Sequence, residues 1–167
     1  MSTQRPLMRL IFLSRRNAAR SQMAEGLLKK HAGDRFEVCS AGLGAGRIHD
    51  LTRQVMSEIG IDISSQHAKR AREFLGKGSF DYAVGLCDPS LTDSPRMFPS
   101  SLEFLFWPFD DPAAGSTAEE ECLQRFRLSR NAIEVRILAW LRQAPWEAKR
   151  GSEPISLPYR GRSASPK

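Results

Sequence analysis

The 167-residue chain is poor in cysteine and has no long apolar run. Its three cysteines, Cys39, Cys87 and Cys122, do not have the number or spacing of a disulfide framework or a metal site, so we expect no metal and no cofactor. Without a long apolar run, the sequence predicts neither a transmembrane span nor a signal peptide, and we expect a cytoplasmic protein that does not contact membranes. The length is that of one domain.

Acidic side chains are in the minority, 19 against 25 basic ones, which gives a formal net charge of +6. Half of this excess falls in residues 146–167, which contain five basic and two acidic side chains among many Pro, Gly and Ser residues. A segment of this composition buries too little apolar surface to fold. We therefore predict a domain over residues 1–145 and a basic, disordered tail over 146–167. The tail offers no stacking platform for bases, so nucleic acid is not a favoured partner.

Apolar periodicity predicts an alternation of strands and helices along the chain. The predicted strands are 10–13, 36–40, 81–86 and 102–106, and the predicted helical segments begin at Ser21 and cover 50–59, 68–75 and 117–143. This order predicts an α/β fold of three layers, α/β/α, with a four-stranded parallel sheet and helices on both faces.

The connection between the first strand and the first helix, residues 14–20, predicts an anion site. A loop at this place points backbone N–H groups from a helix N-terminus at one spot, and Ser21 is suited to cap the helix. Arg20 adds a guanidinium group that matches a tetrahedral oxyanion. On these grounds alone, an ordinary connection with surface arginines is an equal alternative.

Two stretches resemble a known family. Residues 12–26, Phe-Leu-Ser-Arg-Arg-Asn-Ala-Ala-Arg-Ser-Gln-Met-Ala-Glu-Gly, resemble the phosphate-binding loop of the low-molecular-weight protein tyrosine phosphatases and thioredoxin-coupled arsenate reductases, Cys-x5-Arg-Ser, often followed by Gln-Met-Ala-Glu-Gly. Residues 107–113, Trp-Pro-Phe-Asp-Asp-Pro-Ala, resemble its second signature, in which the aspartate before proline is the general acid. The resemblance covers residues 8–143 and implies a low-molecular-weight phosphatase-like fold.

The resemblance also implies the site residues and the ligand. Ser14 at the nucleophile position, Arg20 and the acid Asp111 form the implied catalytic set. Phosphate, arsenate, a sulfate-like anion or a phosphorylated protein is the implied partner. Ala113 stands where the phosphatases commonly have an aromatic residue, which favours the arsenate reductase branch. The implied oxyanion-binding residues are Arg15, Arg16, Asn17, Ala18, Ala19, Arg20 and Ser21.

The loop departs from the family pattern at two positions. Ser14 replaces the nucleophilic cysteine, and Arg16 stands where family loops often have glycine. A helix N-terminus can lower the pKa of a thiol from about 8.5 to roughly 3.5–7.5, but it cannot hold a serine hydroxyl ionised at neutral pH. An arginine is disfavoured where φ must be positive, so Arg16 is expected to strain the loop.

Two other features of the family are incomplete. Cys87 stands where the arsenate reductases begin a disulfide relay, but the partner position is Ser94, so we interpret Cys87 as structural or vestigial. Some members of that branch hold potassium behind the loop, and Asn17, Glu25 and Ser40 match residues used there. The acidic partner is replaced by basic residues near 69–70, so we expect a basic side chain to brace Glu25.

Several other residues suggest only structural roles. We interpret the glycine-rich residues 42–48 as a mobile connection, and Cys39 and Cys122 as packing residues. His49 and His67 are isolated and are interpreted as surface or hydrogen-bonded residues.

Three functional hypotheses follow. The leading one is a pseudoenzyme, an oxyanion-binding member of the family that is catalytically impaired because Ser14 replaces the cysteine. The alternative is an active phosphatase or arsenate reductase that uses Ser14 or another residue, since Arg20 and Asp111 are both present. The third is a non-catalytic interaction protein whose basic tail contacts an acidic partner.

Overall fold

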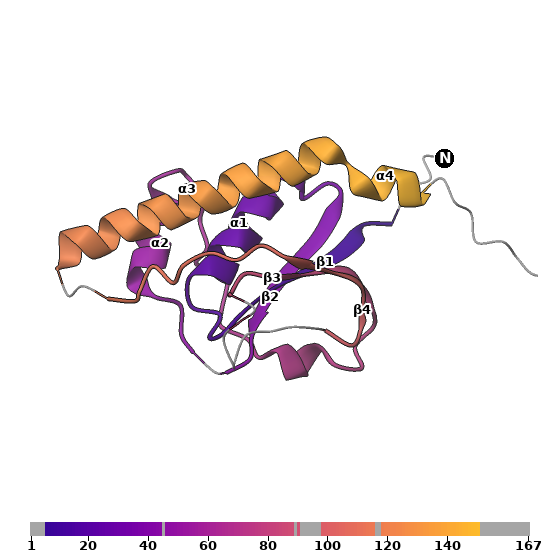
Figure 1. The fold of residues 1–167 in the computed structure, drawn as a ribbon, viewed down its shortest axis with the longest axis horizontal. Coiled ribbons are helices and arrows are strands. Elements are labelled where there is room, and N and C mark those ends of the chain that lie inside the picture. Colours follow the sequence, from indigo (N-terminus) through magenta and orange to yellow (C-terminus); the bar gives the residue numbers. More distant parts are fainter. Residues whose placement is uncertain (1–5, 45, 89, 91–97, 116–117, 151–167) are drawn as a thin grey trace, which may run out of the picture.

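The described part of the chain forms one parallel sheet covered by helices (Figure 1). The computed structural model describes residues 6–44, 46–88, 90, 98–115 and 118–150. The strands are β1 (Met8–Ser14), β2 (Phe36–Gly42), β3 (Phe80–Gly85) and β4 (Ser101–Phe106). The helices are α1 (Arg20–Ala32), α2 (Asp50–Ser57), the 3-10 helix η1 (Ala71–Phe74), α3 (Glu119–Gln143) and α4 (Pro145–Arg150). Among the described residues, no helix combines the length and apolar character needed to cross a membrane.

The strands are all parallel and lie in the order β2-β1-β3-β4, which confirms the predicted four-stranded parallel sheet. Ser14 pairs with Gly42 where β1 and β2 end, and Leu13 pairs with Gly85 where β3 ends. The carboxyl ends of three neighbouring strands therefore meet at one edge of the sheet. This edge is where parallel sheets bind ligands.

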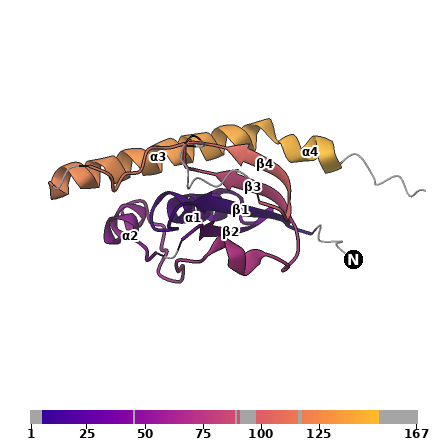
Figure 2. The same ribbon diagram turned by 60° about the horizontal axis from the view of Figure 1, so that its bottom comes forward.

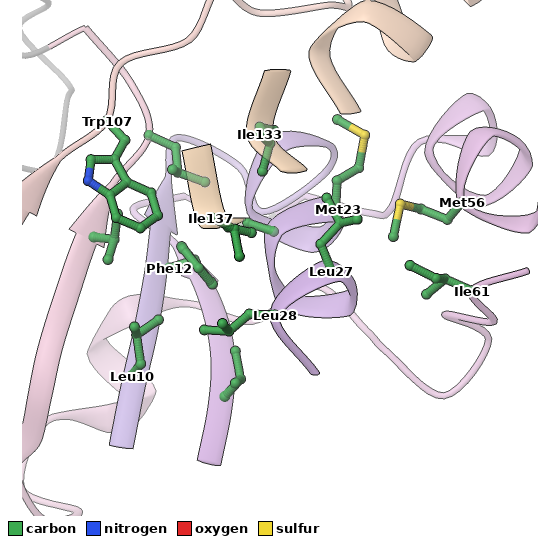
Figure 3. Packing of buried hydrophobic residues seen from close by; sticks show 14 of the residues in the cluster. Leu10, Phe12, Met23, Leu27, Leu28, Met56, Ile61, Trp107, Ile133 and Ile137 are labelled. Carbon is green, nitrogen blue, oxygen red and sulfur yellow. The ribbon is translucent and has the colours of Figure 1, made fainter. Parts of the chain in front are cut away.

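The two faces of the sheet are covered unequally (Figures 1 and 2). On one face, side chains of β1 pack against α1 and α3, and Figure 3 shows Leu10 and Phe12 beside Leu28 and Ile137. On the other face, the described cover includes η1, whose Phe74 packs on a smaller cluster. The predicted helices on both faces are present, but in the described residues the helical part of the third layer is a single 3-10 turn.

α3 begins two residues later than the sequence predicts. Its first helical residue is Glu119, and its N-cap, Ala118, makes no side-chain capping hydrogen bond. Residues 116–117, where the sequence places the start, lie outside the described part of the chain. Three glutamates in the first turn still favour this end of the helix through its dipole.

Ordered structure continues past the predicted boundary at residue 145. Trp146 of α4 is 2% exposed, and its ring lies 5.2 Å from that of Phe36 and 4.8 Å from that of Trp140. The indole therefore completes an aromatic cluster, and residues 146–150 belong with the domain. The rest of the predicted tail, residues 151–167, lies outside the described residues.

Candidate oxyanion site

The loop between β1 and α1 lines a cavity of about 470 Å³ at the carboxyl edge of the sheet. Its other walls come from the chain before and at the start of α2 and from the chain after β4. Ser14, Arg20 and Asp111, the three residues implied as catalytic, all line this cavity. The other implied loop residues that line it are Arg15, Arg16, Ala18 and Ala19.

Backbone donors of the loop are available to a ligand in this cavity. No described residue accepts a hydrogen bond from the backbone N–H of Ala18, Ala19 or Arg20. These groups lie at the N-terminus of α1, where orphan N–H groups and the helix dipole both favour an anion. The loop therefore has the donors that the sequence predicts for an oxyanion site.

Arg20 connects the loop to the segment that follows β4. Its side chain is almost fully buried, and Nη1 donates a hydrogen bond of 2.8 Å to the carbonyl oxygen of Phe109. Its Nη2 lies 3.6 Å from Oδ2 of Asp111, whose side chain is 42% exposed. The buried guanidinium thus brings the implied general acid to the cavity.

Ser14 is buried, and its hydroxyl is already engaged. Its Oγ lies 2.7 Å from Oγ of Ser21 and accepts a hydrogen bond of 3.1 Å from the N–H of Asn17. Ser21 does not cap α1, in contrast to the prediction, because the N-cap is Ala19 and the Ser21 hydroxyl faces Ser14 and Asn17. Ser21 and Asn17 therefore support the loop from behind rather than line the cavity.

Asn17 is the centre of a buried polar network. It is fully buried, has φ of +54°, and donates through Nδ2 to the hydroxyls of Ser21 and Ser40, both at 2.8 Å. Asparagine is one of the few residues that tolerate positive φ. Ser40 Oγ in turn donates to Glu25 at 2.5 Å, which links the loop to a buried carboxylate.

Two ammonium groups neutralise Glu25. Lys29 Nζ lies 2.6 Å from Oε1, and Lys69 Nζ lies 3.6 Å from Oε2, as expected for a basic residue that braces Glu25. The backbone N–H of Lys69 also donates to Oδ1 of Asn17. Two cations beside one carboxylate do not fit a potassium ion at the same place, because the added charge would be repelled. In the described chain, no cluster of three or more His, Cys, Asp or Glu residues has metal-binding geometry.

The glycine-rich segment after β2 supports the loop and is not the free connection that the sequence suggests. The N–H of Gly44 donates to the carbonyl oxygen of Arg15. A Cβ added to Gly42 would lie 2.7 Å from the carbonyl carbon of Arg16, which is closer than real contacts allow. Gly42 is therefore needed for the close approach of the two backbones.

Arg16 does not strain the loop, and that expectation is wrong. Apart from glycines, the described residues with positive φ are Asn17 and Ala144. The tight bend thus falls one residue later than the family pattern suggested, at a residue type that accepts it.

Cys87 follows β3 and lies against the loop. It is 1% exposed, and burial raises the pKa of its thiol, while the charge of Arg20 and a hydrogen bond from the Arg15 N–H act in the opposite direction. Its family partner position, Ser94, lies outside the described residues. Burial also raises the pKa of Cys39, to about 12, which agrees with a packing role.

His49, Gln22 and Gln66 are among the residues of the site to which sequence reasoning assigned no role there, as are Arg47 and Asp50 of the cavity lining. His49 lines the cavity and caps α2, since its Nδ1 accepts the N–H of Leu51 at 3.1 Å. Gln22 Nε2 donates to Oδ1 of Asn17, and Gln66 Nε2 donates to Oε1 of Gln22. Gln22 carried a signal, because it stands in the matched motif, whereas Gln66 and His49 carried none.

Fold and site together define an α/β protein with an oxyanion-binding loop at the carboxyl edge of a parallel sheet. Residues 9–149 match the family described as low molecular weight phosphotyrosine protein phosphatase, and the chain belongs to this family.

Among its relatives are bacterial arsenate reductases. That of Halalkalibacterium halodurans is 41% identical over 129 residues, which cover 77% of this chain and 91% of the relative. That of Bacillus subtilis is 36% identical over 128 residues, with the same shares of 77% and 91%. A solved structure described as an arsenate reductase in the phosphate binding state has a TM-score of 0.68 and 28% identity, and covers 82% of this chain and 98% of its own.

Proposed function

We propose that the protein binds tetrahedral oxyanions, phosphate or arsenate or a phosphoryl group, and that it is a weak catalyst because Ser14 provides a hydroxyl where the family chemistry uses a thiolate. The free N–H groups of Ala18 and Ala19 and the guanidinium of Arg20 support anion binding. A structural relative described in a phosphate binding state supports the same ligand. The observation that carries the proposal is the serine at the first position of a loop that matches the family pattern at Arg20 and Ser21.

A serine nucleophile needs a neighbouring base, and the cavity offers no suitable imidazole. His49 is the histidine that lines it, and Nδ1 of His49 accepts the Leu51 N–H. The neutral ring therefore carries its proton on Nε2, so this nitrogen is a donor and not a base. Since an unassisted serine is a poor nucleophile, Ser14 is expected to support little turnover.

An active enzyme is the second candidate, and the retained acid favours it. Asp111 lies 3.6 Å from Arg20 in the same cavity as Ser14. A carboxylic acid at that place can protonate a leaving oxygen. This candidate differs from the first only in the rate at which residue 14 attacks the substrate as a nucleophile.

The test compares the protein with Ser14→Cys. Both forms are assayed for hydrolysis of p-nitrophenyl phosphate and for thiol-dependent arsenate reduction, and for binding of inorganic phosphate by calorimetry. We expect both forms to bind phosphate and the cysteine form to turn over at least about 10³-fold faster, since loss of a nucleophile in a model protease costs on the order of 10⁶. Ser57→Cys, an exposed thiol on α2, controls for an added cysteine elsewhere.

Measurable turnover by the unmodified protein that equals that of Ser14→Cys overturns the impairment. Failure of both forms to bind phosphate overturns the oxyanion site. If both bind phosphate but neither turns over, the loop is a binding site and its catalytic parts are not assembled for these substrates.

A further inference from the structure

The cavity extends well beyond the site of a tetrahedral ion. Its volume of about 470 Å³ lies in the range of pockets that hold small organic molecules. The outer part of the cavity is formed by exposed side chains, among them Arg16 of the loop, Arg47 before α2 and Asp50 at the start of α2. The chemistry of this outer part should therefore select what the oxyanion is attached to.

Arg16 provides an unneutralised charge at this outer part. Its side chain is exposed and lines the cavity, and no acidic side chain of the described residues lies within ion-pair distance of it. Asp111, another carboxylate of the cavity lining, lies 3.6 Å from Nη2 of Arg20 instead.

Gly46 brings a second arginine to the same rim. A Cβ added to Gly46 would lie 2.6 Å from the carbonyl oxygen of Arg16, so the absence of a side chain lets the backbone before Arg47 press against the loop. Nη2 of Arg47 lies 3.5 Å from Oδ2 of Asp50, but these side chains are 86% and 82% exposed. A pair so exposed contributes little, so Arg47 is free to turn to a stronger partner.

Part of the cavity lining is small and apolar. Ala113 and Ala114 form this part, and neither provides an aromatic surface for a substrate ring. The ring of His49 is already packed against Phe126, with centroids 4.8 Å apart. The lining thus favours an aliphatic ligand over an aryl ester.

We propose that the cavity takes a small aliphatic phosphate ester that carries a second anionic group, with the phosphoryl group at Arg20 and the second anion at Arg16 and Arg47. This inference rests on the proposed oxyanion-binding function. It makes Arg16 and Arg47 specificity-determining residues, because both cationic side chains line the same cavity and attract a second anion there.

The test uses two esters that differ only in the second anionic group. Binding of 3-phosphoglycerate, which has a carboxylate, is compared by calorimetry with binding of glycerol 3-phosphate, which has a hydroxymethyl group at that place. We expect the carboxylate to tighten binding about tenfold, the effect of one charge-assisted contact. Arg47→Gln and Arg16→Gln should each bring the ratio of the two dissociation constants to about 2 or less.

Arg142→Gln is the matched control, since this arginine is exposed at the end of α3 and outside the cavity. It lowers the net charge equally and should leave the ratio unchanged. Because the readout is a ratio, damage that weakens both ligands alike does not affect it. A ratio near 1 in the unmodified protein overturns the inference, and so does an equal fall in Arg142→Gln and Arg47→Gln.

These failures are distinct from failure of the proposed function. If inorganic phosphate and both esters fail to bind, the oxyanion site itself is refuted. If all three bind and the esters bind equally, the oxyanion site stands and only the selection by the rim is refuted.

Discussion

The phosphate-binding loop and the acid segment after β4 line the same cavity but are held in different ways. In the loop, Ser14, Asn17 and Arg20 are at most 6% exposed and each makes hydrogen bonds to other elements or to its neighbours. In the acid segment, Asp111 is 42% exposed, lies near Arg20 and accepts the N–H of Ala113 two residues on. The fold therefore fixes the binding half of the site, whereas the acid depends on few contacts.

Because the two segments are held differently, we expect substitutions in them to have different effects on stability and on catalysis. A change behind the loop should alter both folding and anion binding, because buried polar groups that lose partners are costly. A change in the acid segment should alter only the rate of a competent enzyme.

Asn17→Ala should have the largest effect. The side chain donates to Ser21 and Ser40 and accepts from Gln22 and from the Lys69 N–H, and alanine is disfavoured at φ of +54°. We expect a loss of about 3–5 kcal/mol in the free energy of unfolding, measured with urea, and loss of phosphate binding.

Gln54→Ala is the control for this change, since Gln54 is an exposed amide residue of α2. It should cost less than about 1 kcal/mol. A similarly small cost for Asn17→Ala would show that the buried network does not hold the loop.

Lys69→Met and Lys29→Met test which cation supports Glu25. Distance favours Lys29, at 2.6 Å against 3.6 Å for Lys69, but burial favours Lys69, which is 12% exposed against 46% for Lys29. We give burial the greater weight, because solvent screens the exposed ammonium. We expect Lys69→Met to cost about 2–3 kcal/mol in urea unfolding and Lys29→Met less than about 1 kcal/mol.

The reverse order would mean that the short contact of Lys29 outweighs screening. Phosphate affinity is the second readout, and it should fall with Lys69→Met, because the Lys69 ammonium stabilises the carboxylate that holds Ser40 and, through it, Asn17.

Arg20→Lys tests the link between the two segments. Lysine keeps the charge but lacks the planar guanidinium group. Its single ammonium cannot donate to the Phe109 carbonyl oxygen and bind an oxyanion in the same geometry. We expect phosphate affinity to fall about tenfold or more, with the free energy of unfolding changed by about 1 kcal/mol or less. Arg142→Lys, on the exposed end of α3, should leave both unchanged, and unchanged affinity in Arg20→Lys would remove this residue from the site.

Local sequence patterns are sufficient to predict the sheet and two main residues of the candidate site. The apolar runs predict all four strands within two residues at each end. The loop motif identifies Arg20 and the second signature identifies Asp111, and both residues line one cavity. These features depend on short stretches of chain. The direction of a side chain depends on the whole fold. The sequence therefore predicts that Ser21 caps α1, whereas in the structure its hydroxyl faces Ser14.

The missed features all depend on contacts between distant parts of the chain. Trp146 lies in a polar stretch of the sequence, and it is buried only because the folded chain brings it against Phe36 and Trp140. The sequence predicts that Gly42 belongs to a mobile connection. In the structure, glycine is needed there because the backbone of Arg16, 26 residues earlier, leaves no room for a Cβ atom. A sequence pattern does not show such approaches before the fold is known.

Asp111→Asn should have the smallest effect on stability and a large one on chemistry, and it is best tested in the Ser14→Cys background. The side chain is 42% exposed, so we expect the free energy of unfolding to change by less than about 0.5 kcal/mol. If Asp111 protonates the leaving oxygen, hydrolysis of p-nitrophenyl phosphate should fall about 10²–10⁴-fold. Asp110→Asn is the matched control, because this neighbouring carboxylate is exposed and does not line the cavity. An equal loss of rate in both variants would assign the effect to the charge of the segment, whereas a loss confined to Asp111→Asn shows that the weakly held acid is in place even though the chain lacks the thiol to use it.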